Sequence, residues 1–253
     1  MKKSFLTIIR KCIPDIIVET VYKVYGFADF HRKTALSSHK RFPFAFNDIF
    51  MYLNDQSENT DFDGHYIYHP AWAARIVAKN VPQKHIDISS SLTFATMLSA
   101  FIPVEFYEYQ PSKLYLSNLT EKFADLYCLP FEDNSVISLS CMHVVEHIGL
   151  GRYGDPIDPE GDIKAAGELS RVLAVNGTLL FVVPVGKAKL CYNAHRIYSY
   201  KMVLDLFPEL ILKSFSMVTD TKQLIYDCDP EIVSEQKYAC GCFEFTKPGK
   251  EQK

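Results

Sequence analysis

The chain has 253 residues, of which 48% are hydrophobic and 23% are charged. These proportions are typical of a folded globular protein and exclude a collagen-like, coiled-coil or largely disordered chain. The net charge of -3 disfavours a protein that neutralises many phosphates, so we expect no nucleic-acid partner. The 7 cysteines are scattered and include no Cys-x-x-Cys pair, which is typical of a reducing compartment and indicates a cytoplasmic protein.

The first helical pattern lies near the N-terminus. Apolar residues recur there at roughly helical spacing, at Ile9, Ile13, Ile16, Ile17, Val21 and Val24. Arg10 and Lys11 interrupt the apolar run, so we expect neither a signal peptide nor a transmembrane helix. The pattern favours an amphipathic helix that docks on the body of the protein, and the alternative is contact with a membrane surface.

Residues 1–80 are interpreted as an N-terminal helical extension with a loop. The segment NDQSENTDFDG has the composition of an exposed loop. A short helix is predicted from His69, with Trp72 on its apolar face, and Asn80 and Pro82 end it.

Residues 81–247 alternate between strand and helix patterns, which predicts one α/β domain. Strands are expected at 84–89, 104–111, 135–142 and 178–185, and helices at 92–101 and 162–173. This alternation is typical of a Rossmann-like, mostly parallel sheet covered on both faces. The segments 210–219 and 237–247 break the rhythm and are expected to form an antiparallel pair at one edge. Residues 248–253 are expected to be a disordered tail.

Ligands of such sheets bind outside the carboxyl ends of the strands. The first strand ends at Asp87 and the second at Glu108, roughly 20 residues later, a spacing that suits a carboxylate binding both hydroxyls of a ribose. The turn Ser89-Ser90-Ser91 lacks the glycines that dinucleotide binding requires, which disfavours nicotinamide and flavin dinucleotides. A nucleoside without phosphates, such as S-adenosylmethionine, fits better, and we expect Asp87, Ser89, Ser90 and Glu108 to bind it, with Ser89 and Ser90 at its amino-acid end.

Two runs carry a family resemblance. EKFADLYCLPFEDNSVISLSCMHVVEH and ELSRVLAVNGTLLFVVP resemble class I S-adenosylmethionine-dependent methyltransferases, over roughly 84–184. The resemblance implies that Asp125, ahead of LPF, lies near the adenine. It also implies that Asn176-Gly177 stands where the family usually has a glycine pair, whereas Ser89–Ser91 depart from the family's glycine-rich turn.

A closer resemblance covers roughly 66–220. CMHVVEHIGLGRYGDPIDPEGD and PVGKAKLCYNAHRIYS are similar to an uncharacterised-domain family with a methyltransferase-like fold, to which KHIDISSS and HPAWAARI also conform. This resemblance implies a fold and no particular reaction or substrate.

Polar residues gather where the acceptor of a methyl group would bind. We expect a catalytic group, in which one histidine is the base, made of His143, Glu146, His147 and His195. We expect a small-molecule acceptor to contact Arg152, Tyr153, Asp155, Asn193 and Arg196. The alternative for the glycine-rich loop is that Arg152 and Asp155 pair with each other and hold it.

The sequence therefore predicts an S-adenosylmethionine-dependent methyltransferase acting on a small polar or sugar-type acceptor. The missing glycines also allow a non-catalytic, methyltransferase-like binding module. A third interpretation is a zinc hydrolase, because His143-Val-Val-Glu146-His147 matches H-x-x-E-H, although the glycines and Pro156 that follow oppose the required helix. We expect no metal in the site, and we interpret Cys240 and Cys242 as a buried pair of small hydrophobic side chains.

Overall fold

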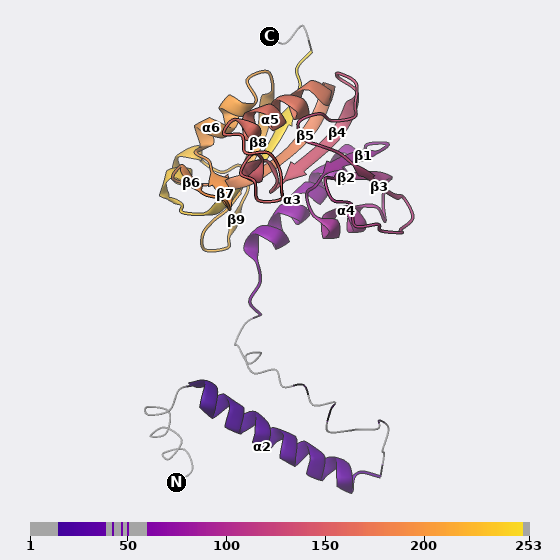
Figure 1. Cartoon of the computed structure of the whole chain (residues 1–253), viewed down its shortest axis with the longest axis vertical. Helices are drawn as coiled ribbons and strands as arrows, with labels where there is room; N and C mark the ends of the chain where they lie inside the picture. Colours follow the sequence, from indigo (N-terminus) through magenta and orange to yellow (C-terminus); the bar gives the residue numbers. More distant parts are fainter. Residues whose placement is uncertain (1–14, 39–41, 43–46, 48–49, 51–59, 250–253) are drawn as a thin grey trace. The chain divides into compact units, whose positions relative to one another are not determined.

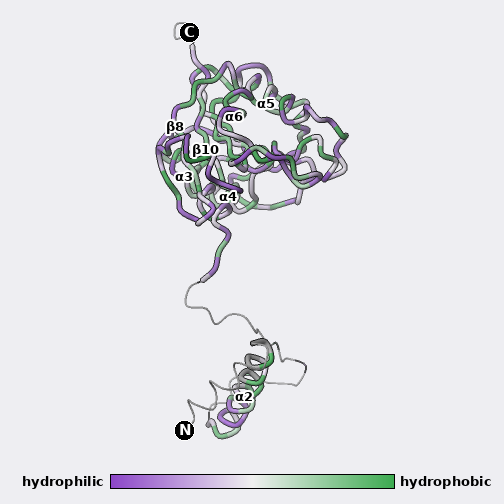
Figure 2. The backbone as a smooth tube through the Cα atoms, turned by 90° about the vertical axis from the view of Figure 1, so that its left-hand side faces the viewer, coloured by the Kyte–Doolittle hydropathy of each residue, from purple (hydrophilic) through white to green (hydrophobic). Residues whose placement is uncertain are grey.

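The computed structural model describes residues 15–38, 42, 47, 50 and 60–249. It divides into two units, Met1–Asp61 and Phe62–Lys253. The first unit contains helix α2 (Asp15–Leu36), along which hydrophobic and hydrophilic residues follow one another (Figure 2). Ile17, Val21 and Val24 of this helix are exposed, whereas Ile9 and Ile13 lie outside the described residues. Docking or membrane contact by this helix stays a prediction.

The second unit alternates strands and helices (Figure 1). Its helices are α3 (Gly64–Asn80), α4 (Leu92–Leu98), α5 (Gly161–Val172) and α6 (Tyr200–Leu206), with the 3₁₀ turns η2 (Val145–His147) and η3 (Pro230–Glu235). Its strands are β1 (His85–Ile88), β2 (Val104–Glu108), β3 (Leu119–Phe123), β4 (Val136–Met142), β5 (Leu173–Val185), β6 (Lys189–Cys191), β7 (His195–Ile197), β8 (Ile211–Val218), β9 (Leu224–Ile225) and β10 (Ala239–Thr246). In the described part of the chain, no helix combines the length and the apolar character that crossing a bilayer would take.

The main sheet has the order β3-β2-β1-β4-β5-β10-β8-β9. The strands from β3 to β5 are parallel, and β10 is antiparallel to both of its neighbours, β5 and β8. This confirms the predicted mostly parallel α/β sheet with an antiparallel side. The predicted pair of β8 and β10 also forms, with β10 inserted between β8 and β5.

Helices cover both faces of the sheet, and the alternation of side chains along β5 shows how. Phe181 and Val183 pack in the core on the side of α5 and α6, whereas Leu180 and Val182 pack on the side of α3 and α4. Successive residues of a strand point to opposite faces, so a strand buried on both faces is an unbroken apolar run.

Helix α3 belongs to the α/β unit, although the sequence placed it in an extension that ended at residue 80. Asp63 caps its first turn by accepting a hydrogen bond from the backbone N–H of Tyr66 at 3.2 Å. Trp72 and Val77 are buried in the same core as Phe94 of α4. The division between the units therefore falls at residues 61 and 62, because this apolar face is part of the sheet's own core. Of the predicted tail, residues 250–253 lie outside the described residues.

Candidate functional site

Two cavities open where the strand order reverses. β2 and β3 lie on one side of β1, and β4 and β5 lie on the other, so the chain changes direction between β1 and β4. This is the position at which open α/β sheets bind ligands. Ser89 directly follows β1 and His143 directly follows β4, and both residues line both cavities.

The first cavity has a volume of about 340 Å³ and brings together three residues predicted to bind a cofactor, Ser89, Glu108 and Asp125. Glu108 accepts a hydrogen bond from the backbone N–H of Tyr109 at 2.8 Å, and burial raises the pKa of its carboxyl group. Asp125 accepts one from the backbone N–H of Tyr127 at 2.8 Å. Both carboxylates are thus held by the backbone at the wall of the cavity.

The serines after β1 leave this cavity open. Ser89 has a φ of 53°, in the left-handed region that usually favours glycine, and its hydroxyl donates to the Tyr107 carbonyl at 3.0 Å. The Ser90 hydroxyl accepts from the backbone N–H of Met142, and Ser91 caps α4 by accepting from the N–H of Phe94. Ser89 therefore adopts a left-handed backbone conformation without being glycine.

Asp87 was predicted to bind the cofactor, but it lies in the interior and lines neither cavity. It accepts a hydrogen bond from Ser140 Oγ at 2.7 Å, and Ser140 Oγ lies 2.9 Å from His85 Nε2. His85 Nδ1 in turn lies 2.7 Å from Ser138 Oγ. β1 is buried along its whole length, so its acidic residue joins a buried polar network instead of facing a ligand.

The second cavity, of about 650 Å³, gathers most of the residues predicted for the acceptor side. The predicted residues that line it are Ser89, Ser90, His143, Glu146, His147, Arg152, Tyr153, Asn193 and His195. Tyr66 of α3, Ala194, and Tyr238 just before β10 also line this cavity and were not predicted from the sequence. Burial lowers the pKa of His195, which favours its neutral form.

Glu146 lies between two histidines and is buried. Its Oε1 is 3.0 Å from His143 Nδ1 and 3.7 Å from His147 Nε2. His147 Nδ1 lies 2.6 Å from the carbonyl oxygen of Ala194, which identifies this nitrogen as the donor. Residues 145–147 form a single 3₁₀ turn, so the helix that a zincin-type H-x-x-E-H site needs is not formed by these residues.

The glycine-rich loop after η2 is held by Asp155. Its carboxylate accepts hydrogen bonds from the backbone N–H groups of Gly149, Gly151 and Tyr153. Arg152 instead donates to the Ala194 carbonyl at 3.0 Å and lies over the Tyr153 ring at 5.1 Å. The alternative of an Arg152–Asp155 pair is therefore not what the structure shows.

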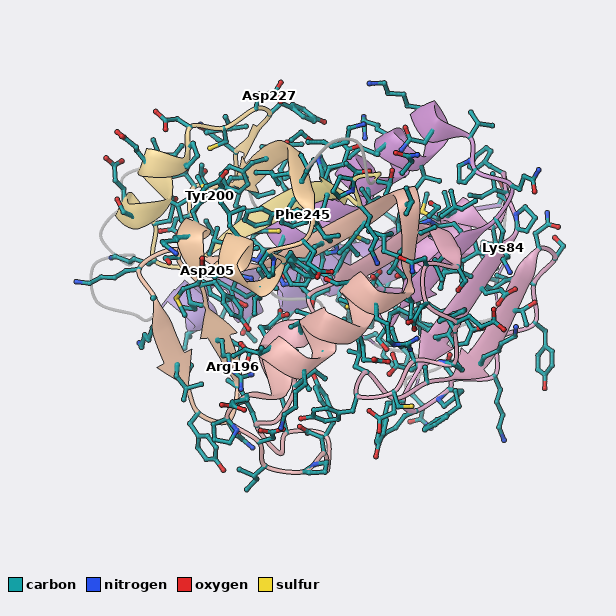
Figure 3. All side chains as sticks on the ribbon, turned by 90° about the horizontal axis from the view of Figure 1, so that it is seen from above. Lys84, Arg196, Tyr200, Asp205, Asp227 and Phe245 are labelled. Carbon is teal, nitrogen blue, oxygen red and sulfur yellow. The ribbon has the colours of Figure 1, made fainter. Side chains whose placement is uncertain are left out.

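Arg196 was predicted to bind the acceptor, but its guanidinium group instead holds the two ends of the same loop. It donates to the carbonyls of Ile148 at 2.7 Å and Pro159 at 3.3 Å, and its Nε is 3.6 Å from Asp162 Oδ2. Figure 3 shows Arg196 beside α5, whose first turn contains Asp162. Arg196 lines neither cavity.

Two histidines of α3, which the sequence did not indicate, pack against His143. The His143 ring stacks on His65 at 5.4 Å and on Tyr66 at 5.5 Å, and it meets His69 edge-on at 4.9 Å. His65 and His69 are one helical turn apart, so both lie on the same face of α3. The four-residue spacing of His65 and His69 was the one sequence feature that could have indicated this cluster. That this face of α3 packs against His143 is evident only from the fold.

Comparison with known proteins agrees with this architecture. A family model described as "Caenorhabditis protein of unknown function, DUF268" matches residues 105–225, just under half of the chain. No curated protein matches the sequence. Among solved structures, a candidate methyltransferase from Bacillus halodurans C-125 is 13% identical with a TM-score of 0.52, and the match covers 71% of this chain and 99% of that one.

A second solved structure contains a ligand. It is the 1,6-didemethyltoxoflavin-N1-methyltransferase of Burkholderia thailandensis with bound 1,6-didemethyltoxoflavin and S-adenosylhomocysteine. It is 10% identical, has a TM-score of 0.52, and the match covers 72% of this chain and 79% of that one. The chain has a class I methyltransferase-like fold. At these identities the likeness establishes the fold alone.

Proposed function

We propose that the chain is an S-adenosylmethionine-dependent methyltransferase that acts on a small polar or sugar-type acceptor. The observation that carries this proposal is that two cavities meet at the switch point of the sheet. Ser89, His143, His147 and Tyr153 line both of them. Methyl transfer requires a donor and an acceptor held in line. Two neighbouring cavities that share lining residues can hold one molecule each at that position.

The residues of the first cavity fit the cofactor. The Glu108 carboxylate has two oxygens for the ribose hydroxyls, and Asp125 lies further along the wall for the adenine edge. Ser89 uses its hydroxyl proton on Tyr107 and keeps its lone pairs for the ammonium of the methionine end. When bound, S-adenosylmethionine would supply an electrophilic methyl group to an acceptor nucleophile, with S-adenosylhomocysteine as the leaving group.

We assign the role of general base to His147. Its Nδ1–H is held by the Ala194 carbonyl, which leaves Nε2 to take a proton from an acceptor hydroxyl. Glu146 Oε1, at 3.7 Å from Nε2, stabilises the imidazolium that forms. Arg152, Tyr153, Asn193 and His195 line the second cavity and offer a cation, a phenol, an amide and an imidazole to a polar acceptor.

Calorimetric titration of the full chain with S-adenosylhomocysteine tests the cofactor site. Glu108→Gln keeps the shape of the side chain and removes its charge, so we expect binding about 10- to 100-fold weaker. Glu209→Gln, at an exposed site outside both cavities, is the control and should bind like wild type. Absence of binding by wild-type protein, or equal binding by Glu108→Gln, would contradict the proposal.

Methyl transfer from labelled S-adenosylmethionine to a panel of sugars and polyols tests the chemistry. Loss of the base in His147→Ala should lower kcat by about 10²- to 10⁴-fold, a much larger factor than the change in S-adenosylhomocysteine affinity of the same variant. Cofactor binding without transfer to any acceptor would favour the binding module instead.

A further inference from the structure

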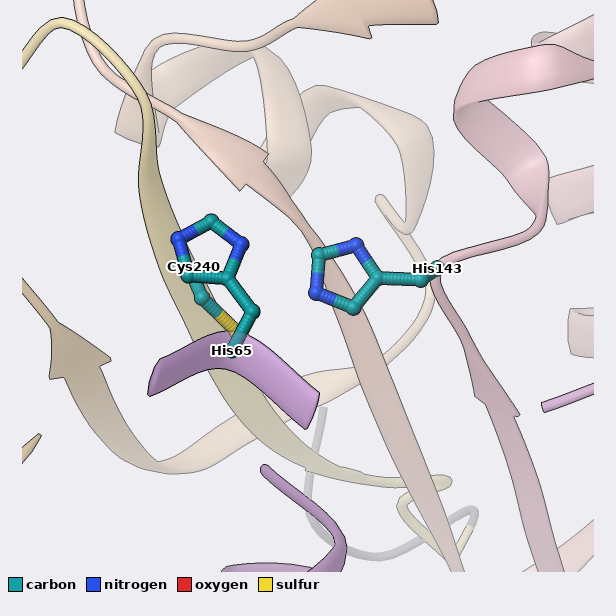
Figure 4. Close-up of side chains that lie close together, drawn as sticks. All are labelled: His65, His143 and Cys240. Atoms are coloured by element: carbon teal, nitrogen blue, oxygen red, sulfur yellow. The ribbon is translucent and has the colours of Figure 1, made fainter. Parts of the chain in front are cut away.

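A cluster of nitrogen and sulfur ligands adjoins the second cavity. His65 comes from the first turn of α3, His143 from the end of β4 and Cys240 from β10. One ligand atom of each residue lies within 4.8 Å of the other two. In Figure 4 the imidazole rings of His65 and His143 lie side by side with an edge of each turned toward the other, and the sulfur of Cys240 lies close to His65.

The hydrogen bonds of both histidines leave one nitrogen of each free to bind a ligand. His143 Nδ1 is 3.0 Å from a Glu146 carboxylate oxygen, and His65 Nε2 is 3.1 Å from the Tyr238 carbonyl oxygen. Both oxygens accept, so these nitrogens carry the protons, and His143 Nε2 and His65 Nδ1 carry the lone pairs. A ring N–H that donates to a carboxylate or carbonyl while the other nitrogen stays free is the usual arrangement of metal-binding histidines.

The free nitrogen of His143 has no hydrogen-bond partner, although its side chain is only 3% exposed. The same holds for His69 Nε2, since His69 Nδ1 donates to the His65 carbonyl at 2.7 Å. Buried polar atoms without a partner are uncommon and costly in folded proteins. The unpartnered His143 nitrogen belongs to a residue of the cluster and therefore indicates a ligand there.

We propose that His65, His143 and Cys240 bind a transition-metal ion of the kind that prefers imidazole and thiolate ligands, such as zinc(II). Two nitrogens and one sulfur from three elements match the ligand types of protein zinc sites with three protein ligands. His69 supplies a further imidazole next to His143. The site differs from the H-x-x-E-H motif, because His143 acts with α3 and β10, and Glu146 orients it without binding metal.

Titration of the metal-free full chain with cobalt(II) and zinc(II) tests this site. We expect one ion per chain, a thiolate-to-cobalt charge-transfer absorption, and a rise in Tm with added zinc. Cys240→Ala should lose the absorption and bind zinc at least about tenfold more weakly. Cys242→Ala is the matched control, since Cys242 is equally buried on the same strand with its sulfur 3.9 Å from that of Cys240, and it should keep both properties.

If Cys240→Ala fails to fold, His65→Gln provides a second test, because His65 is partly exposed. His65→Gln should weaken zinc binding by at least about tenfold. Absence of the absorption in wild type, its persistence in folded Cys240→Ala, or an equal loss in Cys242→Ala would overturn the proposal. Titration of the same preparations with S-adenosylhomocysteine shows separately whether the cofactor site is intact.

Discussion

At the scale of single residues, His85 and Asp87 are buried in one network with opposite changes of pKa. Burial lowers the pKa of His85 from 6.5 to about 3 and raises that of Asp87 from 3.8 to about 7. Between pH 3.8 and 6.5 the unfolded chain therefore has a charged histidine and a charged aspartate, whereas both are neutral in the folded protein. Each state holds one proton, so the pair gives little net pH dependence of stability in that window.

Single substitutions should reveal the separate pH dependences of stability that His85 and Asp87 cause. In Asp87→Asn, His85 remains, and below pH 6.5 it takes up a proton in the unfolded chain but stays neutral in the folded protein. Relative to wild type, the free energy of unfolding of this variant should therefore fall as the pH drops below 6.5. In His85→Gln, Asp87 remains, and between pH 3.8 and about 7 it is protonated in the folded protein but ionised in the unfolded chain. The free energy of unfolding of this variant should therefore fall as the pH rises through that range. Each slope should approach about 1.4 kcal/mol per pH unit. Urea unfolding across this range measures both, and two variants with the slope of wild type would refute the argument.

The left-handed backbone of Ser89 gives a second prediction. In Ser89→Gly, the relief of about 1 kcal/mol of backbone strain is offset by a similar loss of chain entropy, so stability should change by less than about 1 kcal/mol. Ser89→Val places a β-branched residue at positive φ and should lower the free energy of unfolding by about 1–2 kcal/mol. Urea unfolding of the two variants distinguishes them. A valine variant as stable as wild type would contradict the positive φ at residue 89.

At the scale of elements, the glycine-rich loop depends on one carboxylate. Asp155→Ala removes the acceptor of three backbone N–H groups, so we expect a loss of about 1–3 kcal/mol and faster proteolysis within 149–158. Asp205→Ala, which breaks only an exposed ion pair with Lys201 on α6, should cost no more than about 1 kcal/mol. Equal effects of the two substitutions would show that Asp155 does not hold the loop.

The elements that the sequence predicted are those whose packing leaves a local pattern. β4 and β5 are mostly buried and appear as apolar runs, whereas β3, with LTEKF at the edge of the sheet, exposes most of its side chains and was missed. The cluster at the carboxyl ends of β1, β2 and β4 was predictable because parallel strands end at the same side. Arg196 was misplaced because sequence does not show which way a side chain turns. His65 and Cys240 meet only through the packing of α3 against β10, which has no local signature.

At the scale of the whole molecule, the α/β unit should fold without the first unit. A fragment of residues 60–253 keeps α3 and should bind S-adenosylhomocysteine and unfold cooperatively like the full chain. A fragment of residues 81–253 lacks Trp72 and Val77, which uncovers the core on that face of the sheet, and it should not unfold cooperatively. Trp72 is the single tryptophan and is buried, so its fluorescence reports folding of the longer fragment. Failure of that fragment to fold, while the full chain does, would show that residues before 60 are required.

The insertion of β10 between β5 and β8 has a consequence for synthesis on the ribosome. β10 follows every other strand of the sheet along the chain, and Tyr238 comes 173 positions after its partner His65. A chain that ends before residue 239 has open edges on both β5 and β8, and its histidine cluster lacks Cys240. Open edges of this kind promote aggregation, so translation that stops before β10 yields a product for chaperones and proteases, with neither a closed sheet nor a complete site.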